Sequence, residues 1–151
     1  MICTDRRLRL CKALIGAMLV FIWGNSLLPG ELSQAFSDWV KTLLVMLFPG
    51  NDSGHSGSGL LRKIAHFSEF AALGVLLSWF CGMKNKRKSM SMVCGVAVAC
   101  VDEIIQAFVP GRSPALKDVA IDSCGVLTGL VLLRIGYTVL KKRSTQSYFG
   151  G

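Results

Sequence analysis

The sequence predicts an all-α membrane protein, a bundle of four transmembrane helices with an extracytoplasmic amphipathic interfacial helix between spans one and two. Two observations support this prediction. Hydrophobic residues make up 52% of the 151 residues, and they are concentrated in four long runs. The 17 basic residues lie mainly beside alternate ends of those runs. A chain of 151 residues has the length of one domain and no room for a separate catalytic module, so we expect a single domain over residues 1–151.

Each apolar run has about the 20 residues that a helix needs to cross the hydrocarbon core of a bilayer. Three of the runs contain acids or a histidine, and each of these alone is compatible with a buried helix of a soluble protein. Four such runs in one short chain favour the membrane. The predicted spans are residues 11–28, 64–83, 90–109 and 119–140.

The first run also resembles a secretory signal peptide, because basic residues precede it. No small-x-small cleavage site follows it, and the apolar run continues to Leu28. We therefore expect an uncleaved signal anchor that forms the first span.

The connection between spans one and two predicts a helix of a different kind. Over residues 31–48, apolar side chains recur at helical spacing, opposite Ser33, Ser37, Asp38 and Lys41. The apolar face comprises Leu32, Phe36, Trp39, Val40, Leu43, Leu44 and Leu47. We expect this helix to lie in the outer interface with Trp39 at headgroup level, and a re-entrant segment is the alternative. Pro49-Gly50 should end it, before a Gly/Ser-rich connection over residues 51–59 that contains a solvated His55.

The distribution of charge predicts the orientation. Three groups of four basic residues flank the same side of the predicted bundle, and together they are twelve of the 17. The groups are Arg6, Arg7, Arg9 and Lys12; Lys84, Lys86, Arg87 and Lys88; and Arg134, Lys141, Lys142 and Arg143. The positive-inside rule then predicts a multi-pass protein of the cell membrane with both termini in the cytoplasm. The polar tail from Ser144 has nothing to specify structure, and the net charge of +8 is assigned to topology rather than to nucleic-acid binding.

Five ionisable residues lie inside the predicted spans, where each costs about 3 kcal/mol on insertion scales. They are His66, Glu69, Asp102, Glu103 and Asp122. At about 1.5 Å per residue, all five lie one to two turns from the outer ends of spans two, three and four. This shared depth predicts a polar pocket in the outer part of the bundle, to which Gln106 and Asp118 also belong.

Small residues predict how these helices pack. On span four, Gly125 and Gly129 follow Asp122 along one face, and Gly-x-x-x-Gly is typical of closely packed membrane helices. On span three, a row of small residues shares a face with Gln106 and one of the two neighbouring acids. The row consists of Ser91, Gly95 and Ala99. We expect a tightly packed inner half and an outer half that opens into the polar pocket.

Four cations lie near the predicted pocket, where they would meet an anion. They are Arg62, Lys63, Arg112 and Lys117. Guanidinium groups in particular suit phosphate oxygens. The short turn over residues 110–114 is expected to place Arg112 beside Asp118 and Asp122. The structural alternative is that Arg62 and Arg112 only neutralise the pocket acids and brace the helix ends.

Three segments between Leu60 and Gly136 resemble the VanZ-like family of bacterial membrane proteins. They are Arg62-Lys63-x-x-His66-Phe67, Asp102-Glu103-x-x-Gln106-x-Phe108-x-Pro110-Gly111-Arg112 and Asp118-x-x-x-Asp122-x-x-Gly125. The resemblance implies a small multi-span protein, and the founding family member is associated with low-level resistance to the glycopeptide teicoplanin. It implies site residues at Lys63, His66, Glu103, Gln106, Arg112 and Asp118. Asp122 stands where the family is expected to have Asn, which makes this pocket more anionic.

Two classes of function fit these residues. The favoured hypothesis is a non-enzymatic envelope protein that binds or reorients an anionic lipid or cell-wall precursor at the outer leaflet, with a link to teicoplanin resistance. The alternative is an intramembrane hydrolase or transferase on a lipid-linked substrate, with His66, Glu69 and Glu103 as acid–base groups or metal ligands. A structural or assembly partner is a further alternative.

The sequence contains no HExxH, GxSxG or glycine-rich phosphate loop, which disfavours the enzyme. Its six cysteines form no CxxC pair, so neither a zinc site nor a disulfide framework is predicted. We expect no cofactor and no metal. The expected partners are membrane lipids, among them a lipid-linked wall precursor, with no nucleic acid, and an oligomer is left open.

Overall fold

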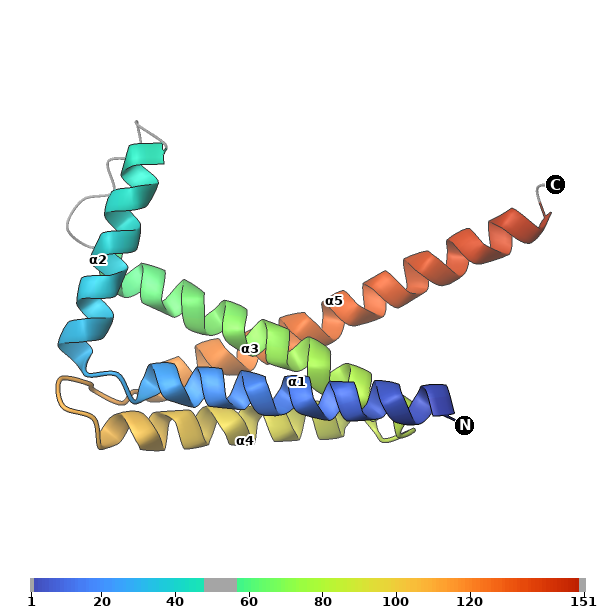
Figure 1. Cartoon of the computed structure of the whole chain (residues 1–151), viewed down its shortest axis with the longest axis horizontal. Coiled ribbons are helices and arrows are strands. Elements are labelled where there is room, and N and C mark those ends of the chain that lie inside the picture. Colours follow the sequence, from blue (N-terminus) through green and yellow to red (C-terminus); the bar gives the residue numbers. More distant parts are fainter. Residues whose placement is uncertain (1, 48–56, 150–151) are drawn as a thin grey trace.

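The computed structural model describes residues 2–47 and 57–149, which form five helices (Figure 1). They are α1 (Ile2–Ser26), α2 (Gly30–Leu47), α3 (Gly57–Met83), α4 (Lys88–Ala107) and α5 (Leu116–Phe149). The described residues contain no strand, so the all-α prediction is confirmed. The predicted stop at Pro49-Gly50 and the connection around His55 lie outside the described residues, and α3 already begins at Gly57.

Four of these helices are long and apolar enough to cross a membrane. Their membrane-spanning segments are Asp5–Ser26, Gly59–Met83, Ser89–Ala107 and Leu116–Lys142. They carry large apolar side chains on their outer surface, and Val20 for example is 74% exposed. Such a surface suits lipid rather than water. The prediction of four spans is therefore confirmed.

The helix ends differ from the predicted boundaries. The first span ends at Ser26 instead of Leu28. The helix α4 ends two residues earlier than predicted, because Pro110 has no N–H group and disfavours helical backbone in the residue before it. The helix α5 continues to Phe149, so the tail that was predicted to lack structure is helical over most of its length.

All four spans contribute to one small core. Its fully buried side chains are Ile22 of α1, Phe70 and Leu73 of α3, Ala99 of α4 and Val126 of α5. Because each helix supplies at least one of these side chains, the core fixes the four spans relative to one another.

Glycines allow α3 and α5 to make the most extensive helix contact in the described structure. A Cβ atom on Gly129 would collide with the carbonyl oxygen of Ala71. A Cβ atom on Gly125 would lie 2.5 Å from the carbonyl oxygen of Phe67. The predicted close packing through these two glycines is therefore confirmed.

The helix α2 lies crosswise at one end of the bundle, which we call the α2 end (Figure 1). The start of α3 and the turn between α4 and α5 lie at the same end. The N-terminus and the turn between α3 and α4 lie at the opposite end, toward which α5 also runs (Figure 1). The chain therefore has the up-and-down arrangement that the four predicted spans require.

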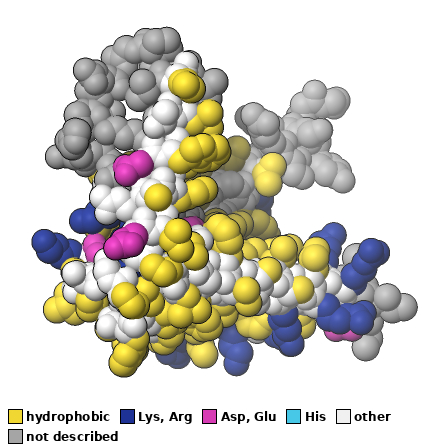
Figure 2. Space-filling model, turned by 60° about the vertical axis from the view of Figure 1, so that its left-hand side comes forward, with side chains coloured by type: hydrophobic (Ala, Val, Ile, Leu, Met, Phe, Trp, Pro, Cys, Tyr) yellow, Lys and Arg dark blue, Asp and Glu magenta, His cyan; other side chains and the backbone are white. Residues whose placement is uncertain are grey.

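The exposed apolar face of α2 comprises Leu32, Phe36, Trp39, Leu43 and Met46. Figure 2 shows hydrophobic side chains along one side of this helix and acidic side chains along another. A helix crosswise to the spans with such a face has the geometry of an interfacial helix. Val40 was predicted on this face but lines a cavity with Ser33 and Ser37. The side chains of Lys41, Leu44 and Leu47 lie outside the described part of the structure.

The turn between α4 and α5 is joined to the start of α2. Gly111 has a φ of 74°, a conformation that side chains with a Cβ atom rarely adopt. Gly30 packs against it so closely that an added Cβ atom would collide with the Gly111 carbonyl group. The N–H group of Gly30 donates a hydrogen bond of 3.1 Å to the carbonyl oxygen of Pro110. These contacts close the α2 end on one side.

Candidate functional site

The predicted polar residues come together at the α2 end, where α3 and α5 begin and α4 ends. A cavity of about 290 Å³ opens between these three helices and the turn that follows α4. Its lining includes Arg62, Lys63, His66, Glu103, Gln106, Asp118 and Asp122, together with Gly59, Gly111, Ser113 and Ile121. Seven of the eleven predicted site residues therefore border one cavity, which we call the polar cavity.

Gln106 connects several of the predicted residues, and it is only 4% exposed. Its amide nitrogen donates to Oδ2 of Asp102 over 2.7 Å and to Oγ of Ser26 over 3.3 Å. Its amide oxygen accepts from Arg62 over 3.2 Å and from Arg112 over 3.4 Å. Because both ends of the amide are engaged, the network holds Gln106 in one orientation and positions the Asp102 carboxylate.

The position of Arg112 corrects the sequence prediction. This side chain was expected to neutralise Asp118 and Asp122, but no carboxylate among the described residues pairs with it. Its guanidinium donates to the carbonyl oxygen of Asn25 over 2.8 Å and to that of Leu28 over 3.2 Å. The Asn25 carbonyl lies in the last turn of α1 and the Leu28 carbonyl follows that turn, where a helix leaves its backbone acceptors without intrahelical partners. Arg112 therefore caps α1.

The other three predicted cations have different surroundings. Lys63 Nζ lies 3.8 Å from Oδ1 of Asp118, and solvent screens this pair because both side chains are partly exposed. Arg62 lines the polar cavity, whereas Lys117 is exposed and does not line it. Burial and the nearby Arg62 guanidinium lower the pKa of Arg112 from its ordinary value, although the side chain stays cationic.

Besides Asp102, two of the predicted acids have defined hydrogen-bond partners. Oε2 of Glu103 accepts a 2.8 Å hydrogen bond from the N–H group of Ala115, immediately before α5. Oε1 of Glu69 accepts a 2.9 Å hydrogen bond from the side chain of Asn25. Glu69 faces a second cavity of about 400 Å³, which Arg62 and His66 also line. Glu69 was predicted in the same pocket as Glu103, but it lines this second cavity and not the polar cavity.

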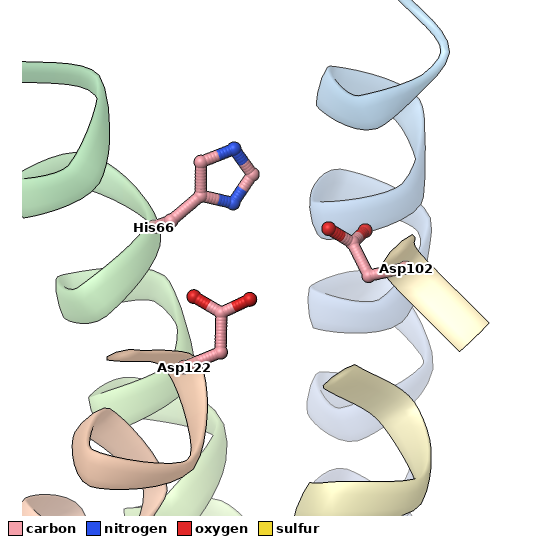
Figure 3. A group of neighbouring side chains, drawn as sticks. All are labelled: His66, Asp102 and Asp122. Carbon is pink, nitrogen blue, oxygen red and sulfur yellow. The ribbon is translucent and has the colours of Figure 1, made fainter. Parts of the chain in front are cut away.

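His66, Asp102 and Asp122 form the closest group of ionisable side chains. One ring nitrogen of His66 and one carboxylate oxygen of each aspartate lie within 4.8 Å of one another. Figure 3 shows the three side chains converging from α3, α4 and α5. Asp102 is 0% and Asp122 2% exposed. The prediction that these three helices place their polar groups at one level is therefore confirmed.

Two polar residues of this region were not predicted. Ser26 is fully buried at the end of α1 and accepts from Gln106, while Asn25 donates to Glu69. Their signal in the sequence is a polar pair that interrupts the apolar end of the first run. At the predicted depth, that pair lies level with the polar groups of the other spans.

The polar cavity offers two kinds of chemistry. Arg62 and the half-exposed Lys63 can attract an anion from the solvent-accessible side. His66 and the buried acids can bind protons or a cation on the inner side.

A family model described as VanZ/LLP1 matches residues 12–137, which is most of the chain. The matched range contains every predicted site residue. Neither a curated protein nor a solved structure matches the chain.

Proposed function

The chain belongs to the VanZ/LLP1 family, and from the charged cavity at the end of its four spans we propose that it binds the anionic headgroup of a lipid or lipid-linked cell-wall precursor. The observation that carries this proposal is the presence of Arg62 and Lys63 on a cavity between membrane-spanning helices. A phosphate group there would satisfy guanidinium donors and an ammonium group together.

The second cavity supports a lipid over a soluble anion. It adjoins the polar cavity through Arg62 and His66, and apolar residues dominate its lining. They include Phe21, Leu28, Phe36, Val40, Leu61 and Ile64. An acyl or polyprenyl chain in this cavity would leave its headgroup beside Arg62. A lipid of this shape would occupy both cavities at once.

The distribution of basic residues supports the outer leaflet as the place of binding. The three basic groups lie on the predicted cytoplasmic side, which corresponds to the end opposite α2. The polar cavity then faces the outer leaflet, where wall precursors are used. The resemblance of residues 62–125 to the VanZ-like family extends the proposal to teicoplanin resistance, with headgroup binding as its basis.

Native mass spectrometry of the detergent-extracted full chain tests headgroup binding. Phosphatidylglycerol and a polyprenyl phosphate are titrated separately against phosphatidylcholine as the zwitterionic comparison. We expect both anionic lipids to bind in preference to phosphatidylcholine. Arg62→Gln should lower the affinity for both anionic lipids at least about tenfold, since a hydrogen bond from a charged group contributes about 1.5–3 kcal/mol. A preference for the polyprenyl phosphate assigns the wall precursor, and a preference for phosphatidylglycerol assigns a bulk lipid.

Lys117→Gln is the matched control, because it removes an exposed charge of the same region that does not line the cavity. Its lipid binding should equal that of the parent. If Arg62→Gln also binds anionic lipids as well as the parent does, the proposed site is wrong. The link to resistance is tested by expressing the parent and Arg62→Gln separately in a teicoplanin-susceptible bacterium. The parent should protect the cells from teicoplanin, and Arg62→Gln should not.

A further inference from the structure

His66, Asp102 and Asp122 have the geometry of a set of metal ligands. Each comes from a different helix, and their donor atoms lie within 4.8 Å of one another. In Figure 3 the imidazole ring and the two carboxylates surround a common space. No spacing rule predicts such a group from sequence, because its three members are far apart along the chain.

The two carboxylates are buried without sufficient partners. Asp122 is 2% exposed, lines the polar cavity and forms no hydrogen bond or ion pair with any described residue. Asp102 is fully buried, and although its Oδ2 accepts from Gln106, its Oδ1 has no hydrogen-bond partner. A buried carboxylate without a partner is costly. Such groups are stabilised by a proton or by a positive ligand, and two of them side by side can share one cation.

The nearby cations do not supply that positive charge. Arg62 and Arg112 donate to Gln106, and Arg112 also donates to the carbonyl groups of Asn25 and Leu28. Lys63 pairs with Asp118 on the exposed side of the cavity. Nδ1 of His66 is also buried without a hydrogen bond, and it lies 3.9 Å from Oε2 of Glu69. No described arginine or lysine side chain therefore pairs with Asp102 or Asp122.

We propose that His66, Asp102 and Asp122 bind one divalent metal ion. Metal–nitrogen and metal–oxygen bonds of about 2.0–2.2 Å allow two donors on one ion to lie up to about 4.4 Å apart, so small side-chain rotations bring all three into range. One imidazole nitrogen with carboxylate oxygens suits ions such as Mn²⁺, Fe²⁺ or Zn²⁺. The Gln106 amide holds Asp102 in place, as outer ligands commonly do at metal sites.

Because His66 and Asp122 line the polar cavity, the remaining coordination positions of the ion face it. A headgroup phosphate held by Arg62 would be a ligand at one of these positions, which extends the proposed lipid binding. The metal site itself requires no lipid. Metal binding and lipid binding are therefore measured separately and can fail separately.

The test uses the full chain without an affinity tag, extracted in detergent and treated with a chelator. Mn²⁺ is the probe, because it binds thiols weakly and so avoids the six cysteines. Electron paramagnetic resonance of free Mn²⁺ should report about one bound ion per chain. Asp122→Asn and Asp102→Asn should each weaken binding at least about tenfold.

Asp118→Asn is the matched control, because it removes a carboxylate from the same cavity without removing one of the three ligands. It should bind Mn²⁺ within about twofold of the parent, a change of less than about 0.5 kcal/mol. Asp122→Asn should melt at a higher temperature than the metal-free parent, because it removes a buried charge without a partner. Mn²⁺ should raise the melting temperature of the parent but not that of Asp122→Asn.

A monodisperse parent that binds no Mn²⁺ overturns the proposal. So does Asp122→Asn binding Mn²⁺ as tightly as the parent, or Asp118→Asn losing as much affinity as Asp122→Asn. If Asp122→Asn does not fold, His66→Gln takes its place with the same expected loss.

Discussion

The guanidinium group of Arg112 donates a hydrogen bond of 2.8 Å to the backbone carbonyl oxygen of Asn25. The contact joins the turn after α4 to the last turn of α1, two segments that lie 87 residues apart in the sequence. It lies at the same end as the hydrogen bond from Gly30 to Pro110, so two connections of the bundle are held together there. Arg112 therefore holds the end of α1 against the turn that borders the cavity, and it is not a counterion of the α5 acids.

Arg112→Ala should destabilise the protein, because the Leu28 carbonyl loses its side-chain donor and the Asn25 carbonyl keeps only the N–H group of Leu28. Hydrogen bonds from a charged group contribute about 1.5–3 kcal/mol each, so we expect a loss of about 3 kcal/mol and a lower melting temperature in detergent. Arg112→Lys should fall between the parent and Arg112→Ala, because an ammonium group cannot reproduce the guanidinium fork. A melting temperature equal to the parent's in Arg112→Ala would contradict the capping role.

Asp122→Asn should add no more stability to Arg112→Ala than it adds to the parent. The two side chains share no hydrogen bond or ion pair, so their effects on the free energy of unfolding should add to within about 0.5 kcal/mol. The thermal stabilities of both single variants and of the double variant form the required cycle. A recovery clearly larger than the gain from Asp122→Asn in the parent would restore the pairing that the sequence suggested.

Gly129→Leu should disrupt the contact between α3 and α5, because there is no space for a side chain beside Ala71. Its yield of monodisperse protein after extraction should fall well below that of the parent. Gly136→Leu is the control on the same helix, since a Cβ atom at Gly136 meets nothing within 4 Å. Equal yields from the two variants would show that the helices do not approach through Gly129.

Trp39 should lie at the membrane interface, on the exposed apolar face of α2. In a protein that carries Trp23→Phe and Trp79→Phe, its fluorescence should be quenched most by lipids brominated near the glycerol end of the chain. The control places a tryptophan at the exposed Gln34 in a background that also carries Trp39→Phe. Quenching of the Gln34→Trp protein should be weaker, and equal quenching would contradict an interfacial α2.

Glu103→Gln should leave stability close to that of the parent, because a glutamine oxygen can still accept from the N–H group of Ala115. Glu103→Ala removes that acceptor and should cost about 1–3 kcal/mol, measured by thermal unfolding. Lipid binding by Glu103→Gln then separates two roles of the residue. Binding at the parental level means that Glu103 only holds the start of α5, whereas lost binding by a stable protein means that its charge acts in the cavity.

The predicted orientation places Ser113 outside the cell and Asn85 in the cytoplasm, and both residues are exposed in turns. In intact cells, a membrane-impermeant maleimide should label Ser113→Cys, whereas it should label Asn85→Cys only after permeabilisation. The parent protein is treated in the same way as a control for labelling of its native cysteines. Labelling of Asn85→Cys from outside would invert the topology and move the polar cavity to the cytoplasmic leaflet.

The sequence alone was sufficient for the spans, the crosswise helix and the shared level of the polar groups. These features depend on local properties, since a bilayer requires each span to be apolar along its own length. Helical periodicity likewise assigns Gly125 and Gly129 to one face without reference to any other helix. Most of the correct predictions therefore concern relationships between residues of the same helix.

Partners between helices were decided only by the tertiary structure. Periodicity gives the face of a helix but neither its rotation against its neighbours nor the angle at which it crosses them. Arg112 has a long side chain that can reach several acceptors, and only the packed bundle selects the carbonyl groups of Asn25 and Leu28 over the acids of α5. For the same reason, the convergence of His66, Asp102 and Asp122 followed from the crossing of three helices and not from any spacing along the chain.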